Sequence, residues 1–282
     1  MSLIGVDLGG TNARAGLIKR AKLVRIVSGR IDSRGSAKDV LNELYGVIDS
    51  LISRAVKGIG VGAPSVMDLE RGIVYDVQNI PSWKRVPLRN YLEERYGLPI
   101  YINNDANCFA VGEKYFGEAK GYSQVVGLIV GTGLGAGVII NGRLYPGPNC
   151  GAGEFGMISY RDHNYEHYCS GQFFRNFYRL SGVEVYERAR RGDAEARRVF
   201  AEFGGHLGEA LKAIMYAVDP EIIVLGGSVS RAYRFFREAM WASVKTFAYS
   251  SVLRKIRIHP SRVPNIAILG AAALFYDATA VR

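Results

Sequence analysis

The chain has 282 residues, of which 48% are hydrophobic, and this length and composition exclude a disordered protein. No apolar stretch approaches the roughly 18 residues of a membrane span, and the start lacks the pattern of a signal peptide, so we expect a cytoplasmic protein without membrane contacts. The formal net charge is +10, with basic clusters at 188–198 and 254–262. Neither cluster belongs to a recognisable nucleic-acid module, so we expect a mixed-charge surface and no nucleic-acid partner.

Short strands alternate with helices in both halves of the chain. In chain order, the predicted elements are a three-strand unit at 3–24, a helix at 36–56, strands at 58–62 and 99–103, a helix within 106–120, a second three-strand unit at 125–145, a helix at 194–218 and a strand at 221–225. Ser36 and Asp39 are spaced as a capping box for the first helix, and Pro220 follows the 194–218 helix. This alternation predicts an α/β protein.

The two three-strand units look like copies of one structure about 122 residues apart. Each consists of an apolar strand, a turn of glycine and threonine, a second apolar strand, a polar turn and a third strand. Two related lobes with a ligand cleft between them are therefore expected.

Both glycine turns, VDLGGTNARAG and GTGLGAG, are suited to hold phosphates, because chains with few side chains bring backbone amides close to phosphate oxygens. GTGLGAG also satisfies the spacing of a dinucleotide fingerprint, but the residues after it are β-branched, and that fingerprint must open a helix. A third glycine pair, Gly226-Gly227, follows the strand at 221–225 and is either a simple turn or the wall of a flat-ring site.

The stretch YINNDANCFA at 101–110 places polar residues where a core strand ends. The residues are Asn103, Asn104, Asp105 and Asn107. An ordinary turn and a catalytic carboxylate in a sugar pocket are the two interpretations of this pattern.

Five motifs in order resemble the ROK sugar kinases of the actin-like ATPase superfamily, and most closely the archaeal ATP-dependent glucokinases and hexokinases. These motifs are DLGGT, NDAN, GTGLGAG, AGEFG and LGGSVS. The resemblance implies a two-lobed actin-like ATPase (ribonuclease H-like) fold in which each lobe is a five-stranded mixed sheet flanked by helices. It places a small lobe at 1–106 and a large lobe at 107–267, with a final helix at about 268–282 packing back on the first lobe.

The resemblance also implies roles for individual residues. Asp105 corresponds to the general base that takes the proton from a sugar hydroxyl as it attacks the γ-phosphate. The substrate-binding residues that it implies are Ser65, Asn79, Asn104, Asp105, Glu154 and Glu166. The ATP-binding residues that it implies are Asp7, Gly9, Gly10, Thr11, Asn12, Thr132, Gly133, Gly135, Gly226, Gly227 and Ser228. The resemblance implies that Asp7 holds Mg²⁺ through water.

The segment 153–171 departs from the family pattern. Most members have a histidine and a cysteine cluster that binds zinc, whereas here Met157 replaces the histidine and the segment is too short for the cluster. When the segment is aligned backwards from Ser170-Gly171, Glu166 falls on the sugar-binding glutamate of the family. Because the cysteine cluster is missing, we expect no structural zinc. A different zinc site built on His163, His167 and Cys169 is the alternative.

The resemblance therefore implies an ATP-dependent hexokinase or glucokinase that acts on the 6-hydroxyl of glucose. Loss of the histidine predicts broad acceptance of hexoses, and Ser65, where the family usually has glycine, complicates that expectation. An N-acetylhexosamine kinase or a fructokinase is the alternative. A sugar-responsive repressor would need a DNA-binding domain before Asp7, and an actin-like assembly ATPase would leave the sugar-site residues unexplained. A homodimer is expected from the family alone.

Overall fold

A computed structural model describes residues 1–77 and 79–280, and two five-stranded sheets dominate it. The first sheet contains, in spatial order, β3 (Lys22–Arg30), β2 (Asn12–Lys19), β1 (Ser2–Leu8), β4 (Val56–Ala63) and β8 (Ile100–Asn104). The second contains β11 (Arg143–Leu144), β10 (Leu134–Ile140), β9 (Val125–Val130), β14 (Ile222–Gly226) and β15 (Arg257–Pro260). A small sheet of β5 (Val66–Asp68), β6 (Ile73–Tyr75) and β7 (Arg85–Val86) accompanies the first.

The two large sheets have the same topology. In each, the first strand pairs antiparallel with the second and parallel with the fourth, and a fifth strand continues the parallel part. The predicted repeat of a three-strand unit is confirmed by this match. The third strand is longer than predicted in the first unit, because β3 is a largely exposed sheet edge where polar residues face solvent.

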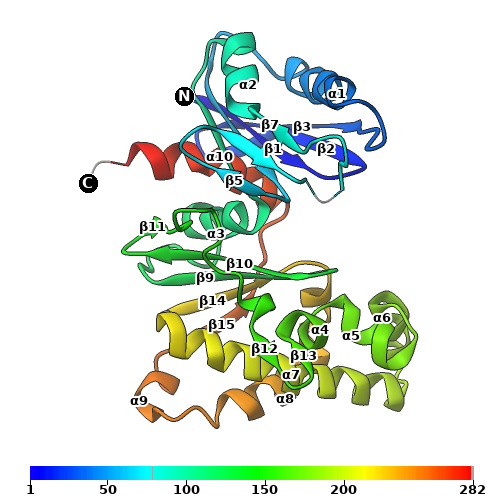
Figure 1. The fold of residues 1–282 in the computed structure, drawn as a ribbon. Coiled ribbons are helices and arrows are strands. Elements are labelled where there is room, and N and C mark those ends of the chain that lie inside the picture. Colours follow the sequence, from blue (N-terminus) through cyan, green and yellow to red (C-terminus); the bar gives the residue numbers. More distant parts are fainter. Residues whose placement is uncertain (78, 281–282) are drawn as a thin grey trace.

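The helices surround and separate the two sheets (Figure 1). They are α1 (Ala37–Asp49), α2 (Leu88–Tyr96), α3 (Asp105–Phe116), α4 (Tyr165–Cys169), α5 (Gly171–Tyr178), α6 (Gly182–Arg190), α7 (Ala194–Val218), α8 (Tyr233–Val244), α9 (Ser250–Leu253) and α10 (Ile266–Thr279). The predicted 194–218 helix is confirmed as α7. No helix in the described part of the chain is long and apolar enough to cross a membrane.

Helix α1 begins where predicted and ends early. The backbone amide of Asp39 donates to Ser36 Oγ at 3.2 Å, and that of Ser36 donates to Asp39 Oδ2 at 3.1 Å, which completes the capping box. The predicted end at residue 56 is wrong. The Ser50 hydroxyl donates to the carbonyl of Gly46 at 2.9 Å, and the chain then turns so that Leu51 enters the core.

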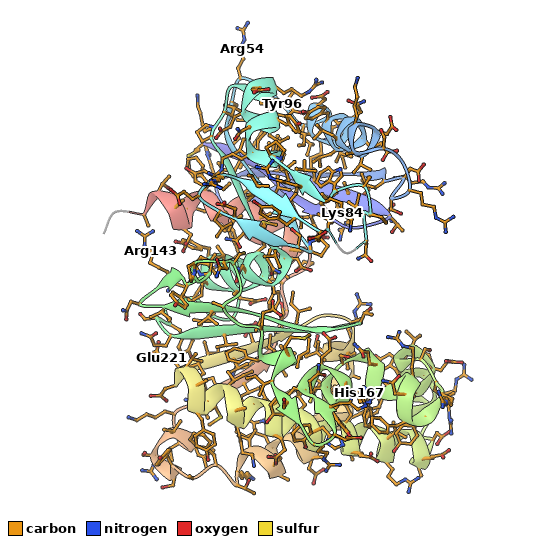
Figure 2. The ribbon with its side chains drawn as sticks, viewed as in Figure 1. Arg54, Lys84, Tyr96, Arg143, His167 and Glu221 are labelled. Carbon is orange, nitrogen blue, oxygen red and sulfur yellow. The ribbon has the colours of Figure 1, made fainter. Side chains whose placement is uncertain are left out.

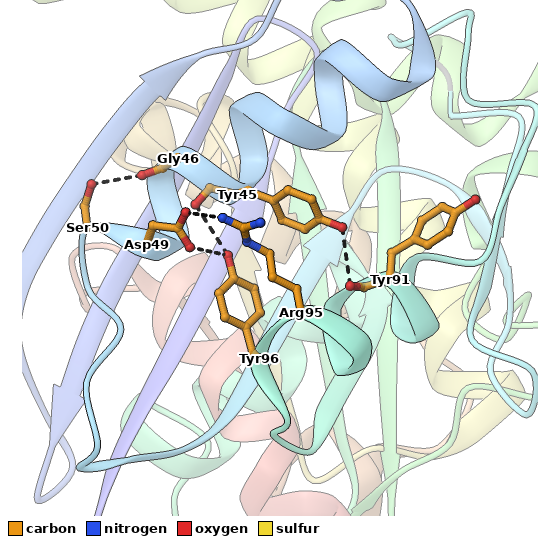
Figure 3. Close-up of polar contacts among 7 residues, drawn as sticks. All are labelled: Tyr45, Gly46, Asp49, Ser50, Tyr91, Arg95 and Tyr96. Carbon is orange, nitrogen blue, oxygen red and sulfur yellow. Dashed lines mark hydrogen bonds and ion pairs between the residues drawn. The ribbon is translucent and has the colours of Figure 1, made fainter.

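A surface ion pair joins α1 to α2 (Figure 3). Arg95 Nη2 lies 2.6 Å from Asp49 Oδ2, and the Tyr96 hydroxyl donates to Asp49 Oδ1 at 2.8 Å. The Arg95 guanidinium also lies 4.4 Å from the centroid of the Tyr45 ring. These contacts fix the outer helices of the first half, on the far side of its sheet from α10 (Figure 1).

Helices α3 and α10 pack against each other between the two sheets (Figure 1). A Cβ added at Gly270 of α10 would lie 1.8 Å from the carbonyl oxygen of Cys108, so only glycine permits this close approach. Helix α10 also covers strands β1 and β4, while α3 covers β9 and β10. Arg143 of β11 donates to the carbonyls of Asp277 and Ala280, and its side chain lies near the end of α10 in Figure 2. Because α3 and α10 lie between the sheets of both halves, the expected boundary between the lobes at 106/107 stays a prediction.

Each half has its own hydrophobic core. In the second half, the rings of Phe173, Phe174 and Phe203 pack together beneath the sheet. In the basic cluster at 188–198, Arg188 forms ion pairs at 2.7 Å with both Asp193 and Glu195. Such pairs are typical of the mixed-charge surface that the sequence predicts.

Candidate active site

Asp105 lies at a sharp strand-to-helix turn. Strand β8 ends at Asn104, whose side-chain oxygen caps α3 by accepting bonds from the backbone amides of Ala106 and Asn107 at 2.7 and 3.3 Å. Asp105 is the first residue of α3, and its own Oδ1 accepts from the Ala106 amide at 2.9 Å. The turn lies at the carboxyl end of the parallel strands, where α/β sheets usually bind ligands.

Asp7 of β1 lies close enough to Asp105 for their charges to interact. Burial raises the pKa of Asp105, and bonds from the backbone amides oppose this. Burial and then the charge of Asp105 raise the pKa of Asp7, which Arg14 counteracts. Arg14 is paired with Asp7 across the β1–β2 ladder and donates to the side chain of Asn265.

Glu154 and Glu166 bring carboxylates from the second half of the chain to the same site. Partial burial raises the pKa of Glu154, and the charges of Glu166 and Asp105 raise it further. Glu166 Oε2 accepts from the backbone amide of Leu134 at 2.9 Å, and its Oε1 accepts from Gln172 Nε2 at 2.8 Å. The site therefore gathers four carboxylates, Asp7, Asp105, Glu154 and Glu166, from both halves.

Two further predicted residues border this group from the first half. Ser65 follows the end of β4, and Ala63 of β4 is paired with Asn104 in the sheet. Asn79 is exposed and lies against Gly10, since a Cβ added at Gly10 would be only 2.2 Å from Asn79 Cβ. The structure thus brings Asn79 to the first glycine turn.

Both glycine turns connect antiparallel strands. Residues 9–12 close the turn between β1 and β2, where the Gly9 amide donates to the carbonyl of Asn12 at 3.0 Å. The Gly131 amide donates to the carbonyl of Gly133 at 3.0 Å in the turn between β9 and β10. A Cβ at Gly133 would lie 2.6 Å from Glu166 Oε2, and one at Gly135 would lie 3.4 Å from Ala106 Cβ. Because a strand follows GTGLGAG, the dinucleotide-fingerprint interpretation is excluded.

A cavity of about 350 Å³ lies beside the second turn, in the second half. Thr132 and Ser228 are both on its wall, and Phe174, Phe200 and Val229 contribute apolar surface. Gly226 and Gly227 precede Ser228 at the end of β14. Gly227 adopts φ +84°, and a Cβ there would lie 2.3 Å from the carbonyl oxygen of Val130, so both the backbone and the space require glycine. Of the predicted residues, Thr132 and Ser228 thus line one hollow of a size that suits a nucleoside, and Gly226 and Gly227 directly precede Ser228 in the chain.

The helix that carries Glu166 is held by aromatic contacts. The rings of Tyr160 and Tyr165 stack at 4.6 Å, and the hydroxyl of Tyr160 lies 3.1 Å from His206 Nδ1. Tyr168 packs edge-on against Tyr160 at 5.3 Å and bonds to Asp162 through its hydroxyl. This aromatic packing fixes α4 against the second glycine turn, which Glu166 contacts.

The alternative zinc ligands do not form a cluster. The rings of His163 and His167 stack at 4.0 Å, whereas Cys169 is fully buried in the core, where burial raises the pKa of its thiol. Over residues 1–77 and 79–280, no group of three or more His, Cys, Asp or Glu residues is arranged to hold a metal ion. Metal binding at this segment stays a hypothesis without geometric support.

Several residues of the site escaped prediction. Arg14 lies opposite Asp7 in the sheet, Gln172 donates to Glu166, Cys150 bonds to Asn103, and Tyr186 and Arg231 line the cavity. The strand register could have placed Arg14, and Gln172 directly follows Ser170-Gly171, whereas the other three residues carry no local motif.

Comparisons with known proteins identify the family of this chain. The ROK family model matches residues 3–278. A glucokinase of Thermotoga maritima is 28% identical over 98% of each chain, and an N-acetyl-D-glucosamine kinase of Mannheimia succiniciproducens is 31% identical over 97% of this chain and 99% of its own. The crystal structure of a ROK glucokinase from Streptomyces griseus with glucose and AMPPNP has a TM-score of 0.81 at 26% identity, covering 97% of this chain and 99% of that one.

The predicted actin-like α/β fold with two mixed sheets is confirmed by this structural similarity. Because the family model covers nearly the whole chain, and a relative of more than 30% identity matches over almost its full length, the chain belongs to the ROK family of sugar kinases.

Proposed function

We propose that this protein transfers the γ-phosphate of ATP to the 6-hydroxyl of glucose and of other hexoses. The observation that carries the proposal is the position of Asp105, at a strand-to-helix turn and close enough to Asp7 and Glu154 for their charges to interact. The oxygen of the hydroxyl would form a bond to the γ-phosphorus as the bond to the ADP oxygen breaks, and its proton would pass to the Asp105 carboxylate.

The sugar would lie against residues from both halves. Asn79, Asn104 and Ser65 offer amide and hydroxyl groups, while Glu154 and Glu166 offer carboxylate oxygens that accept bonds from sugar hydroxyls. Asn104 uses its side-chain oxygen to cap α3, so its amide nitrogen is the group available to a sugar. Because Glu166 already accepts two bonds, its role toward the sugar includes orienting the second glycine turn.

ATP would span the two glycine turns. The backbone amides at 9–12 and 132–135 would meet the phosphates, and the cavity lined by Thr132 and Ser228 would take the adenosine. A side chain at Gly10 would strike Asn79, so the glycine allows the first turn to pack against a residue proposed to bind the sugar.

The residues present suit Mg²⁺ held by Asp7. Carboxylate oxygen is the ligand that Mg²⁺ prefers, and the repulsion between Asp7 and Asp105 would be relieved by a divalent cation. Bound together with ATP, Mg²⁺ would neutralise phosphate charge during transfer.

Two observations bear on which sugar is the substrate. Met157 is 53% exposed and supplies no hydroxyl partner of its own, which favours tolerance among hexoses over strict selection. The similarity to an N-acetyl-D-glucosamine kinase supports an N-acetylhexosamine as the second candidate substrate, and fructose remains a third.

A screen of ADP release tests the proposal. Purified protein with ATP and Mg²⁺ is given glucose, mannose, fructose, glucosamine, N-acetylglucosamine or N-acetylmannosamine in turn, and the phosphorylated carbon is identified by NMR. We expect the highest kcat/KM with glucose and phosphate on carbon 6. Preference for an acetamido sugar would establish the second candidate. ADP release that no sugar accelerates would contradict the proposal and favour an assembly ATPase.

A further inference from the structure

Cys150 belongs by sequence to the second half but by packing to the first. It lies in the loop between β11 and the short helical turn at Phe155–Met157, four residues before Glu154. Its side chain is only 4% exposed and is part of the hydrophobic core of the first half. The loop that carries Glu154 therefore inserts one side chain, that of Cys150, into the core of the other half.

The thiol takes part in a buried hydrogen-bond network around Asp105. Cys150 Sγ donates to Asn103 Oδ1 at 3.3 Å and accepts from Asn107 Nδ2 at 3.7 Å, while Asn107 Nδ2 also lies 2.8 Å from Asn103 Oδ1. Asn103 and Asn107 stand two residues before and two residues after Asp105. The network thus joins the Glu154 loop directly to the segment that contains the proposed base.

The direction of these bonds is determined. Asn103 Oδ1 accepts from the Asn104 backbone amide at 2.9 Å, so it must be the carbonyl oxygen, and it then requires donors from Asn107 and Cys150. Burial raises the pKa of the Cys150 thiol, so it keeps its proton and can donate. Asn107 Oδ1 is buried without a partner among the described residues, so loss of the thiol would leave a network that already contains one unsatisfied acceptor with a second unpaired contact, at Asn107 Nδ2 or Asn103 Oδ1.

The backbone at Cys150 is strained. Its φ is +55°, in the left-handed region that favours glycine and that a residue with a side chain adopts at a cost of about 1 kcal/mol or more. A glycine would relieve this strain, so the contacts of the thiol must hold the loop in place against it.

We propose that Cys150 is a positioning residue, which locks the loop of Glu154 against the Asn103–Asn107 segment so that Glu154 and Asp105 face the sugar together. This inference rests on the proposed function for its sugar. This role differs from simple core packing, because the thiol joins two proposed substrate-binding segments through hydrogen bonds and not only through apolar contact.

Three variants separate positioning from packing. Cys150→Gly relieves the backbone strain and removes the thiol, so we expect the hexose KM to rise about ten- to hundredfold while the KM for ATP stays unchanged. Cys150→Ser keeps a donor and an acceptor at the same place, and we expect it to restore the hexose KM to within about threefold. Val47→Ala truncates another side chain of the same core that is as deeply buried as Cys150, and should lower Tm without changing the hexose KM.

Hydrogen exchange provides a readout that needs no catalysis. Peptides covering 145–154 should exchange faster in Cys150→Gly than in the native protein, and at the native rate in Cys150→Ser. An unchanged exchange rate in Cys150→Gly, or a serine variant as impaired as the glycine variant, would overturn the inference. If no hexose is phosphorylated by the native protein, the proposed function fails, while the exchange experiment still decides whether the thiol anchors the loop.

Discussion

Glu166 Oε2 accepts a hydrogen bond of 2.9 Å from the backbone amide of Leu134, so a carboxylate expected on the sugar side holds the glycine turn expected on the nucleotide side. Gln172 supplies the second donor to Glu166, at 2.8 Å. A change at this one side chain should therefore alter the binding of both substrates.

Glu166→Gln should raise KM for ATP and for hexose together, each roughly tenfold, because a glutamine cannot accept from two donors without turning its own N–H groups toward one of them. Steady-state kinetics with each substrate varied in turn measures this. Glu202→Gln, a change at an exposed carboxylate on α7, is the control and should alter neither KM. A change confined to the hexose KM would show that the bond to Leu134 does not shape the turn.

Asp105→Asn should lower kcat about 10²- to 10⁴-fold with little change in hexose affinity, since the side chain keeps its size and loses its ability to accept a proton. Turnover is followed by ADP release, and sugar binding is followed by calorimetry. The exposed Asp76→Asn, whose partner is Lys84, serves as the matched control and should leave kcat unchanged. Near-native turnover in Asp105→Asn would remove Asp105 from the mechanism.

The same substitution should raise Tm at pH 7. Burial raises the native pKa of Asp105 above its unfolded value, so this group favours folding at low pH, and that contribution is lost as pH rises through the native pKa. Asparagine removes the buried charge, so its advantage should be present at neutral pH and should shrink as the pH falls below the unfolded pKa of about 3.9. Differential scanning calorimetry across pH measures both parts. A Tm advantage of equal size at every pH would contradict this account.

The acid limb of kcat/KM should lie above the ordinary aspartate pKa of about 3.9, because Asp105 must be ionised to accept the proton and its pKa is raised by burial. Glu154→Gln should move this limb to lower pH, since it removes a negative charge that interacts with Asp105. A pH profile of both proteins decides the matter. A limb that stays in place in the variant would mean that the two carboxylates do not interact.

Gly10→Ala should lower kcat/KM for ATP about a hundredfold, because its Cβ would lie 2.2 Å from Asn79 Cβ and would displace the turn. Gly46→Ala is the matched control. Gly46 lies in α1 with nothing within 4 Å of an added Cβ, so alanine there should stabilise the protein by about 0.5–1 kcal/mol and leave kinetics unchanged. Equal kinetics in the two variants would show that the first turn tolerates a side chain and does not approach the phosphates.

Local features of this protein were predictable from sequence for a simple physical reason: they depend on residues close together in the chain. Such features are the glycine turns between apolar strands, the Ser36–Asp39 cap and the helical periodicity of the 25-residue α7, and each is present. The order of the five motifs was sufficient to predict the family and the two-sheet fold, and Asp105 was placed correctly at the end of a strand.

Only the tertiary structure decided how the separate motifs meet. The charge interaction of Asp105 with Asp7 and Glu154, the bond from Leu134 to Glu166 and the insertion of Cys150 into the first half join residues that are far apart in sequence. The contacts between the two halves depend on the packing of α3 and α10 between the sheets, which involves many residues at once. Periodicity and turn chemistry depend on the near neighbours of a residue along the chain. They do not determine which side chain from a distant segment will pack against that residue.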